Sequence, residues 1–224
     1  MIPLRDSQPS RSFPVVTVWL IILNVAIFLF EWSLEPFSRN HFVSLYGMVP
    51  AHFSATSLIT SMFLHGGFMH LLGNMWFLWI FGDNIEDILG RGKYLGFYLV
   101  CGVAAALVHL FFNIDSRIPT VGASGAIAGV MGAYMVMYPH ARITTLFPII
   151  IFFTTVDLPA WFILVYWFVI QIFSGVGELA ASTGVEQGGV AWFAHVGGFL
   201  VGALLIKMLP TRERYRMYPE LHWR

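Results

Sequence analysis

The sequence predicts an all-α membrane protein, a bundle of six transmembrane helices with both termini in the cytoplasm. Three observations support this prediction. Of the 224 residues, 58% are apolar and 11% are charged, against about 45–50% and about 25% in soluble domains. Several apolar runs approach the length of about 20 residues that a helix needs to cross a bilayer. Basic residues gather in alternate connections between these runs.

Six apolar runs predict the six transmembrane helices. They cover residues 15–32, 69–81, 94–112, 124–138, 158–173 and 190–209, and we expect the second to continue helically to residue 88. The first run is too long for the apolar region of a signal peptide, and no small-residue cleavage site follows it. We therefore expect the first run to be a membrane span.

The distribution of Lys and Arg predicts the orientation. With the N-terminus in the cytoplasm, ten of these residues fall in inner segments and two, Arg39 and Arg117, in outer segments. Basic residues are enriched in the cytoplasmic connections of membrane proteins. We predict an N-terminal cytoplasmic segment at 1–14, a membrane domain at 15–209 and a basic cytoplasmic tail at 210–224. The bias suits a bacterial inner membrane, among others.

Two connections contain most of the residues between the predicted helices. The outer connection at 33–68 is too polar to span, and connections of this length are usually functional. Pro148 interrupts the apolar stretch before the fifth helix, so we predict that residues 146–153 form an apolar loop at the membrane interface. Asp157 and Pro159 are typical of a helix start, and we predict that Asp157 caps the fifth helix.

Polar side chains occur early in the second, fourth and sixth helices, where the predicted topology places them in the outer part of the bilayer. They are His70 and Asn74, one turn apart, Ser124 and His195. Polar groups at membrane depth are costly and mark either a functional site or a satisfied core hydrogen bond. A lone Ser or His is usually the latter, but four such groups at one depth favour a site.

Ser124 and His195 are a candidate nucleophile and general base. Ser124 opens the fourth helix, whose first N–H groups have no partner inside the helix and can stabilise negative charge. The imidazole of His195 can take a proton near neutral pH, while Asn74 and His70 can donate to an oxyanion. Small residues four apart let the two helices approach closely: Gly125 and Gly129, and Gly198 and Gly202.

These residues resemble the rhomboid family of intramembrane serine proteases, and the likeness covers essentially the whole chain from the first to the sixth helix. The motifs that carry it are His65, His70 and Asn74, then Gly122-Ala123-Ser124-Gly125, then Ala194-His195 followed by Gly198 and Gly202. The resemblance implies a rhomboid-like six-helix bundle around a water-filled cavity open to the outside. It implies cleavage of single-span transmembrane proteins near the outer end of the substrate helix.

The resemblance also implies the role of each site residue. Ser124 would be the nucleophile and His195 the general base. Asn74, His70 and the backbone N–H of Ser124 would form the oxyanion hole, with Gly122 alongside. No metal or other cofactor is expected.

The chain departs from the family pattern at two places. Ala128 stands where some members carry an aromatic residue that packs on the histidine, so another residue must hold the ring. The Trp-Arg pair of some first outer loops is missing, and Tyr-Gly-Met-Val-Pro occupies residues 46–50. The loop before the sixth helix, with Glu178 and Glu186, could cap the site or serve as a plain connector.

Three other functions remain open. A non-catalytic membrane scaffold would bind helices without cutting them. A metal site could use His65, His70 and His195, although no His-Glu-x-x-His string or acidic partner accompanies them. A transporter is disfavoured because buried carboxylates and inverted repeats are missing from the sequence. The formal charge of zero gives no indication of a nucleic-acid partner, and Cys101 is expected to be buried.

Overall fold

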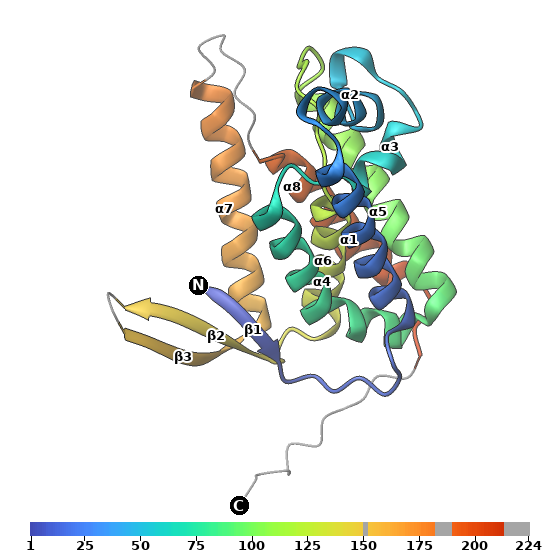
Figure 1. Ribbon diagram of the computed structural model, residues 1–224. Helices are drawn as coiled ribbons and strands as arrows, with labels where there is room; N and C mark the ends of the chain where they lie inside the picture. Colours follow the sequence, from blue (N-terminus) through green and yellow to red (C-terminus); the bar gives the residue numbers. More distant parts are fainter. Residues whose placement is uncertain (150–151, 182–189, 213–224) are drawn as a thin grey trace, which may run out of the picture.

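A computed structural model describes residues 1–149, 152–181 and 190–212 as a helical bundle with a small sheet at one end (Figure 1). The helices are α1 (Val15–Ser33), α2 (Pro36–Tyr46), α3 (Ser57–Thr60), α4 (Phe68–Leu89), α5 (Arg91–Phe112), α6 (Ser124–Met137), α7 (Ala160–Ala181) and α8 (Trp192–Met208), with 3-10 turns at Pro50–His52 and Ser61–Phe63. The strands are β1 (Ile2–Asp6), β2 (Arg142–Ile149) and β3 (Phe152–Pro159).

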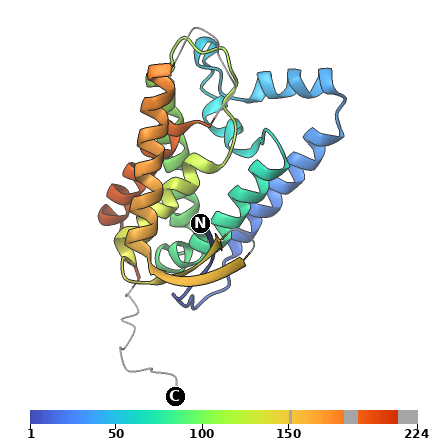
Figure 2. The same cartoon turned by 90° about the vertical axis from the view of Figure 1, so that its left-hand side faces the viewer.

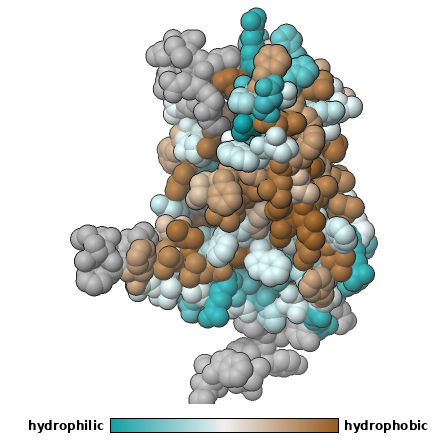
Figure 3. All heavy atoms as spheres, in the orientation of Figure 1, coloured by the Kyte–Doolittle hydropathy of each residue, from teal (hydrophilic) through white to brown (hydrophobic). Residues whose placement is uncertain are grey.

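Each of the six predicted apolar runs coincides with one long helix, namely α1, α4, α5, α6, α7 or α8. Among the described residues, three helices are long and apolar enough to cross a membrane: Val15–Ser33, Arg91–Phe112 and Ala160–Gly177. The helices Ser124–Met137 and Trp192–Met208 are apolar but shorter. Apolar residues form a broad band across the middle of the face shown in Figure 3. The count of six crossings and their orientation stay predictions.

Helix α6 lies at the centre of the bundle and packs against α4, α5, α7 and α8. Every residue from Gly125 to Tyr134 is buried, as expected of a helix that is apolar on all sides. Its backbone lies in close contact with that of α8. A Cβ atom added to Gly202 on α8 would lie only 2.0 Å from the carbonyl oxygen of Gly129 on α6. The expected close approach of these two helices is therefore present.

A buried carboxylate joins α1 to α4. Glu86 on α4 accepts hydrogen bonds from the backbone N–H of Val16 at 2.9 Å and of Thr17 at 2.8 Å, and from the Thr17 hydroxyl at 2.9 Å. These N–H groups belong to the first turn of α1, where a helix has no internal acceptors and favours a negative charge. Glu86 therefore caps α1 from a neighbouring helix. The expectation that the sequence holds no buried carboxylate is wrong, because Glu86 and Glu31 are both buried.

Segments from both ends of the described chain meet at the turn between α4 and α5. The Ser12 hydroxyl donates to Asp87 at 2.6 Å, and the backbone N–H of Arg212 donates to the carbonyl of Ile88 at 2.8 Å. Gly90 forms this turn with a φ of +76°, a conformation that favours glycine. The start of α1 and the end of α8 consequently lie at the same end of the bundle.

The predicted interfacial loop at 146–153 is wrong in its local structure, because residues 146–149 and 152–153 belong to two paired strands. Residues 150–151 of that prediction lie outside the described residues. Strand β2 pairs antiparallel with β3 in a sheet of order β1-β2-β3, which projects sideways beneath α7 (Figures 1 and 2). Neighbouring threonines favour strands because of their branched Cβ atoms. Asp157 is not a helix cap: its carboxylate accepts a hydrogen bond from Thr144 across the strands at 2.7 Å, and α7 begins at Ala160.

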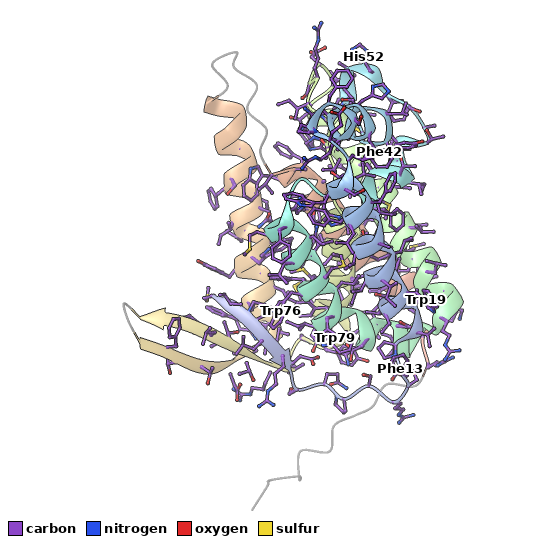
Figure 4. The ribbon with its side chains drawn as sticks, in the orientation of Figure 1. Phe13, Trp19, Phe42, His52, Trp76 and Trp79 are labelled. Carbon is purple, nitrogen blue, oxygen red and sulfur yellow. The ribbon has the colours of Figure 1, made fainter. Side chains whose placement is uncertain are left out.

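Strand β1 ties the N-terminal segment to the bundle. The indole N–H of Trp76 on α4 donates to the carbonyl of Pro3 at 2.6 Å (Figure 4). The Tyr134 hydroxyl of α6 donates to the carboxylate of Asp6. The predicted cytoplasmic segment at 1–14 is thus partly a strand in the sheet.

The outer connection folds into short helices that reach the loop before α6. Met48 and Thr120 form an antiparallel bridge through two hydrogen bonds, from Met48 N–H at 3.0 Å and from Thr120 N–H at 2.8 Å. The N–H of Gly122 donates to the carbonyl of Ser61 at 2.9 Å. Residues of the outer connection therefore hold the segment that leads into Ser124.

Candidate active site

Ser124 and His195 are in direct contact. The Oγ atom of Ser124 lies 2.7 Å from Nε2 of His195, although the two residues are 71 positions apart. Ser124 is the first residue of α6, and the preceding Ala123 provides no side-chain cap for the first turn. His195 is buried on α8. The contact exists because the glycine surfaces of α6 and α8 bring the two backbones together.

Helix α7 holds the imidazole of His195 on its other side. Nδ1 of His195 lies 2.7 Å from Oε1 of Gln171. The Trp167 ring packs on the imidazole, with centroids 5.6 Å apart and planes at 38°. These two residues contact the imidazole in a chain that carries Ala128 instead of an aromatic residue that could pack on it. Sequence reasoning missed both, although a glutamine inside an apolar helix is the kind of signal that marks a buried contact.

Gly122, His70 and Asn74 meet beside Ser124. A Cβ atom on Gly122 would lie 2.8 Å from two atoms of the His70 ring and 3.6 Å from Nδ2 of Asn74. Gly122 also has a φ of +128°, which L side chains rarely adopt. Its N–H is already bonded to Ser61. Gly122 therefore leaves free the small space against the His70 ring that a Cβ atom would fill. Nδ2 of Asn74 is buried and makes no hydrogen bond to a described residue.

A small cavity lies next to Ser124. Its volume is about 30 Å³, enough for a water molecule, which needs about 10–15 Å³. Small residues from several segments line it, among them Gly122, Gly125, Ala126 and Ala194. A candidate nucleophile, a candidate base, an unpartnered amide donor and a space for a small group thus lie near the first turn of α6.

Comparison with known proteins agrees with this geometry. The Rhomboid domain family matches residues 52–212, which is more than half of the chain and includes every residue of the site. The chain belongs to the rhomboid family. It is accordingly a multi-pass membrane protein.

Several named rhomboid proteins are similar to this one. Rhomboid protein 1, mitochondrial, of Saccharomyces cerevisiae is 31% identical over 224 residues, covering 95% of this chain and 60% of the yeast protein. Presenilin-associated rhomboid-like protein A, mitochondrial, of Danio rerio is 36% identical over 98 residues, covering 42% and 26%. A Bacillus subtilis protein named as a rhomboid protease is 33% identical over 130 residues, covering 57% and 64%. This rhomboid chain therefore spans less than two thirds of the yeast and zebrafish relatives.

The other histidines of this rhomboid protein have separate surroundings. His65 is buried with its ring centroid 5.3 Å from that of His70. Burial, and to a lesser degree His70, lower the pKa of His65 to about 3, so it is neutral near pH 7. Nε2 of His109 lies 3.0 Å from the Thr120 hydroxyl. His52 is exposed at the end of the bundle that lies away from the sheet (Figure 4).

The structure also bears on the alternative metal site and on the two glutamates expected in the loop before the sixth helix. Within residues 1–149, 152–181 and 190–212, no group of three or more His, Cys, Asp or Glu side chains is placed to hold a metal ion. Glu178 lies within α7 rather than in a loop, and Glu186 lies outside the described residues.

Proposed function

We propose that this protein is an intramembrane serine endopeptidase that hydrolyses single-span transmembrane proteins near the outer end of their helix. The observation that carries the proposal is the 2.7 Å contact between Ser124 Oγ and His195 Nε2. An alcohol within hydrogen-bond reach of an imidazole is the arrangement needed to activate a serine nucleophile. Membership of the rhomboid family supports the same activity.

In the first half of the reaction, Ser124 Oγ attacks the carbonyl carbon of the scissile peptide bond. Nε2 of His195 takes the hydroxyl proton as the new C–O bond forms. The tetrahedral intermediate collapses by breaking its C–N bond, and Nε2 returns the proton to the leaving amine. The products of this half are a free amine and an ester between the substrate's acyl group and Ser124.

The negative oxygen of the tetrahedral intermediate needs donors that are already in place. Nδ2 of Asn74 and the ring of His70 lie beside the position that a Cβ atom of Gly122 would occupy. The N–H of Ser124 belongs to the first turn of α6, where a helix has no internal acceptors. Donors fixed before the reaction stabilise developing charge without reorganising. Gly122 has no Cβ atom, so the oxyanion can occupy that space.

In the second half, water attacks the ester. His195 takes a proton from the water and returns it to Ser124 Oγ as the C–O bond to serine breaks, which releases the acid. The cavity of about 30 Å³ beside Ser124 has room for that water. The reaction requires neither a metal nor another cofactor.

A transmembrane segment of another protein is the substrate that we propose. A helical substrate must unwind locally before its carbonyl is accessible, because helical carbonyls are bonded within the helix. The expected bacterial inner membrane is not confirmed, since relatives from yeast and zebrafish are named as mitochondrial. The membrane of residence therefore stays a prediction.

A liposome assay tests the proposal. The purified chain is reconstituted with a tagged single-span substrate, beside Ser124→Ala and the control Ser38→Ala, whose serine lies on α2 in the outer connection. We expect cleavage by the wild type and Ser38→Ala, and none by Ser124→Ala. A fluorophosphonate probe followed by mass spectrometry should label Ser124. Equal cleavage by Ser124→Ala, or substrate binding without cleavage by the wild type, would reject the mechanism.

A further inference from the structure

We propose that Gln171 on α7 is a positioning residue that holds His195 in the tautomer able to accept a proton from Ser124. The proposal rests on the proposed protease function, because it concerns the base of that reaction. The observation behind it is a line of contacts through the imidazole. Oε1 of Gln171 lies 2.7 Å from Nδ1, and Ser124 Oγ lies 2.7 Å from Nε2.

The orientation of the Gln171 amide follows from its second contact. Its Nε2 group donates to the backbone carbonyl of Trp167, one turn earlier on the same helix, at 3.3 Å. Reversing the amide would place its oxygen against that carbonyl oxygen, where neither can donate. The amide oxygen therefore faces His195, and it can only accept a hydrogen bond.

The tautomer of His195 follows from this acceptor. A neutral imidazole carries one N–H and one lone pair. Since Oε1 of Gln171 requires a donor, the proton resides on Nδ1 and the lone pair on Nε2. The lone pair then faces the Ser124 hydroxyl, which donates to it. In the opposite tautomer Nε2 would donate to Ser124 Oγ and could not take its proton.

Burial of both side chains strengthens the effect of Gln171 on the tautomer of His195. Gln171 is 5% exposed and His195 is 8% exposed, so water competes weakly for either nitrogen. A neutral amide provides an acceptor here without the desolvation cost of a carboxylate. Trp167 both accepts from the Gln171 amide and packs its ring on His195. One turn of α7 thus fixes the tautomer and the plane of the imidazole together.

Variants of Gln171 separate positioning from packing. Gln171→Met keeps the length of the side chain and removes the acceptor, whereas Gln171→Glu keeps an acceptor. Ile170→Met is the matched control, since Ile170 is 39% exposed on the same helix. In the liposome assay we expect Gln171→Met to lower kcat by about 10²-fold with KM unchanged, a typical loss for impaired acid–base catalysis. Ile170→Met should match the wild type.

Gln171→Glu should recover most of the lost kcat and change its pH dependence. A carboxylate at this position stabilises the imidazolium form, so the acid limb of the kcat–pH profile should move to higher pH. The described titratable groups that act on His195 from α4 and α5 are His70 and His109. Both histidines are unchanged in these variants. A shift of the acid limb of the kcat–pH profile therefore reports the effect of the new carboxylate.

A measurement without substrate tests the tautomer itself. ¹⁵N NMR of histidine-labelled protein in micelles, with His195→Ala to assign the signal, should show an Nδ1–H imidazole in the wild type and a mixture of tautomers in Gln171→Met. If the wild type cleaves and Gln171→Met keeps the full kcat and the same tautomer, the proposed role of Gln171 is wrong and the protease function stands. A wild type that neither cleaves nor labels at Ser124 would instead reject the protease function, while the NMR result would still report the tautomer.

Discussion

Gly198 on α8 lies directly against the backbone carbonyl of Gly125 on α6, and a Cβ atom at Gly198 would be 2.0 Å from that oxygen. Gly125 follows Ser124 in the chain, and Gly198 lies about one turn after His195. A close approach of the two helices therefore lies beside the proposed dyad. Gly129 and Gly202 repeat the contact at 2.0 Å further along the same helices.

Gly202→Ala should destabilise the protein without touching the dyad directly. The added methyl group collides with the Gly129 carbonyl, which cannot rotate away, so α8 must shift. Overpacking of this kind costs about 1–3 kcal/mol. We expect a lower thermal unfolding midpoint in detergent and reduced cleavage. Gly96→Ala is the control, because nothing lies within 4 Å of a Cβ there; equal midpoints for the two variants would contradict the prediction.

Gly122→Ala should impair the proposed oxyanion hole. A residue with a Cβ atom is strained at a φ of +128°, and its methyl group would lie 2.8 Å from the His70 ring. We expect kcat to fall by at least about 10²-fold, as for the loss of an oxyanion donor. Cleavage kinetics in liposomes measure the effect. Activity within a few-fold of the wild type would show that the space at Gly122 is not used.

Asn74→Ala should slow turnover by about 10²-fold while Ser124 remains reactive. The variant removes Nδ2, a buried donor without a partner among the described residues, but leaves the Ser124–His195 contact intact. Labelling by a fluorophosphonate should therefore persist. Asn40→Ala, an exposed position on α2, serves as the control. Unchanged turnover in Asn74→Ala would remove this residue from the hole.

Asp6 should make folding stability depend on pH. Burial raises the pKa of Asp6 from 3.8 to about 6, against the lowering effect of the Tyr134 hydrogen bond. The folded state then binds the proton more tightly than the unfolded state, so this contribution to stability is full below pH 3.8 and is lost as the pH rises through about 6. Its size is on the order of 1–3 kcal/mol.

Comparing unfolding midpoints of the wild type and Asp6→Asn across this interval measures the contribution. The asparagine variant should lack the component assigned to Asp6, because its side chain does not titrate. Parallel midpoint curves for the two proteins would show that Asp6 is not responsible.

The helices were predictable from the sequence because apolar length alone identifies them. The run 15–32 became Val15–Ser33, and 124–138 became Ser124–Met137. The hairpin of β2 and β3 was not predicted, because an apolar stretch interrupted by Pro148 is compatible with a strand as well as with an interfacial loop. Paired threonines at 144–145 and 154–155, one pair on each of the two strands, were the available strand signal.

Part of the candidate site was predictable from two sequence properties: the spacing of residues within one helix and the common depth of residues on different helices. His70, Asn74, Ser124 and His195 meet because α4, α6 and α8 are neighbours. Gln171 could not be found in this way. Its contact with His195 depends on how far α7 lies from α8 and which face it presents, and neither is encoded in a local pattern.

The single cysteine offers a way to follow this protein without a substrate. Cys101 is fully enclosed, and a Cβ atom added to Gly129 on α6 would lie 2.6 Å from its sulfur. A maleimide can therefore reach the thiol only when α5 and α6 separate. The rate of thiol alkylation in liposomes thus reports how often the centre of the molecule opens, in the same bilayer in which cleavage is measured.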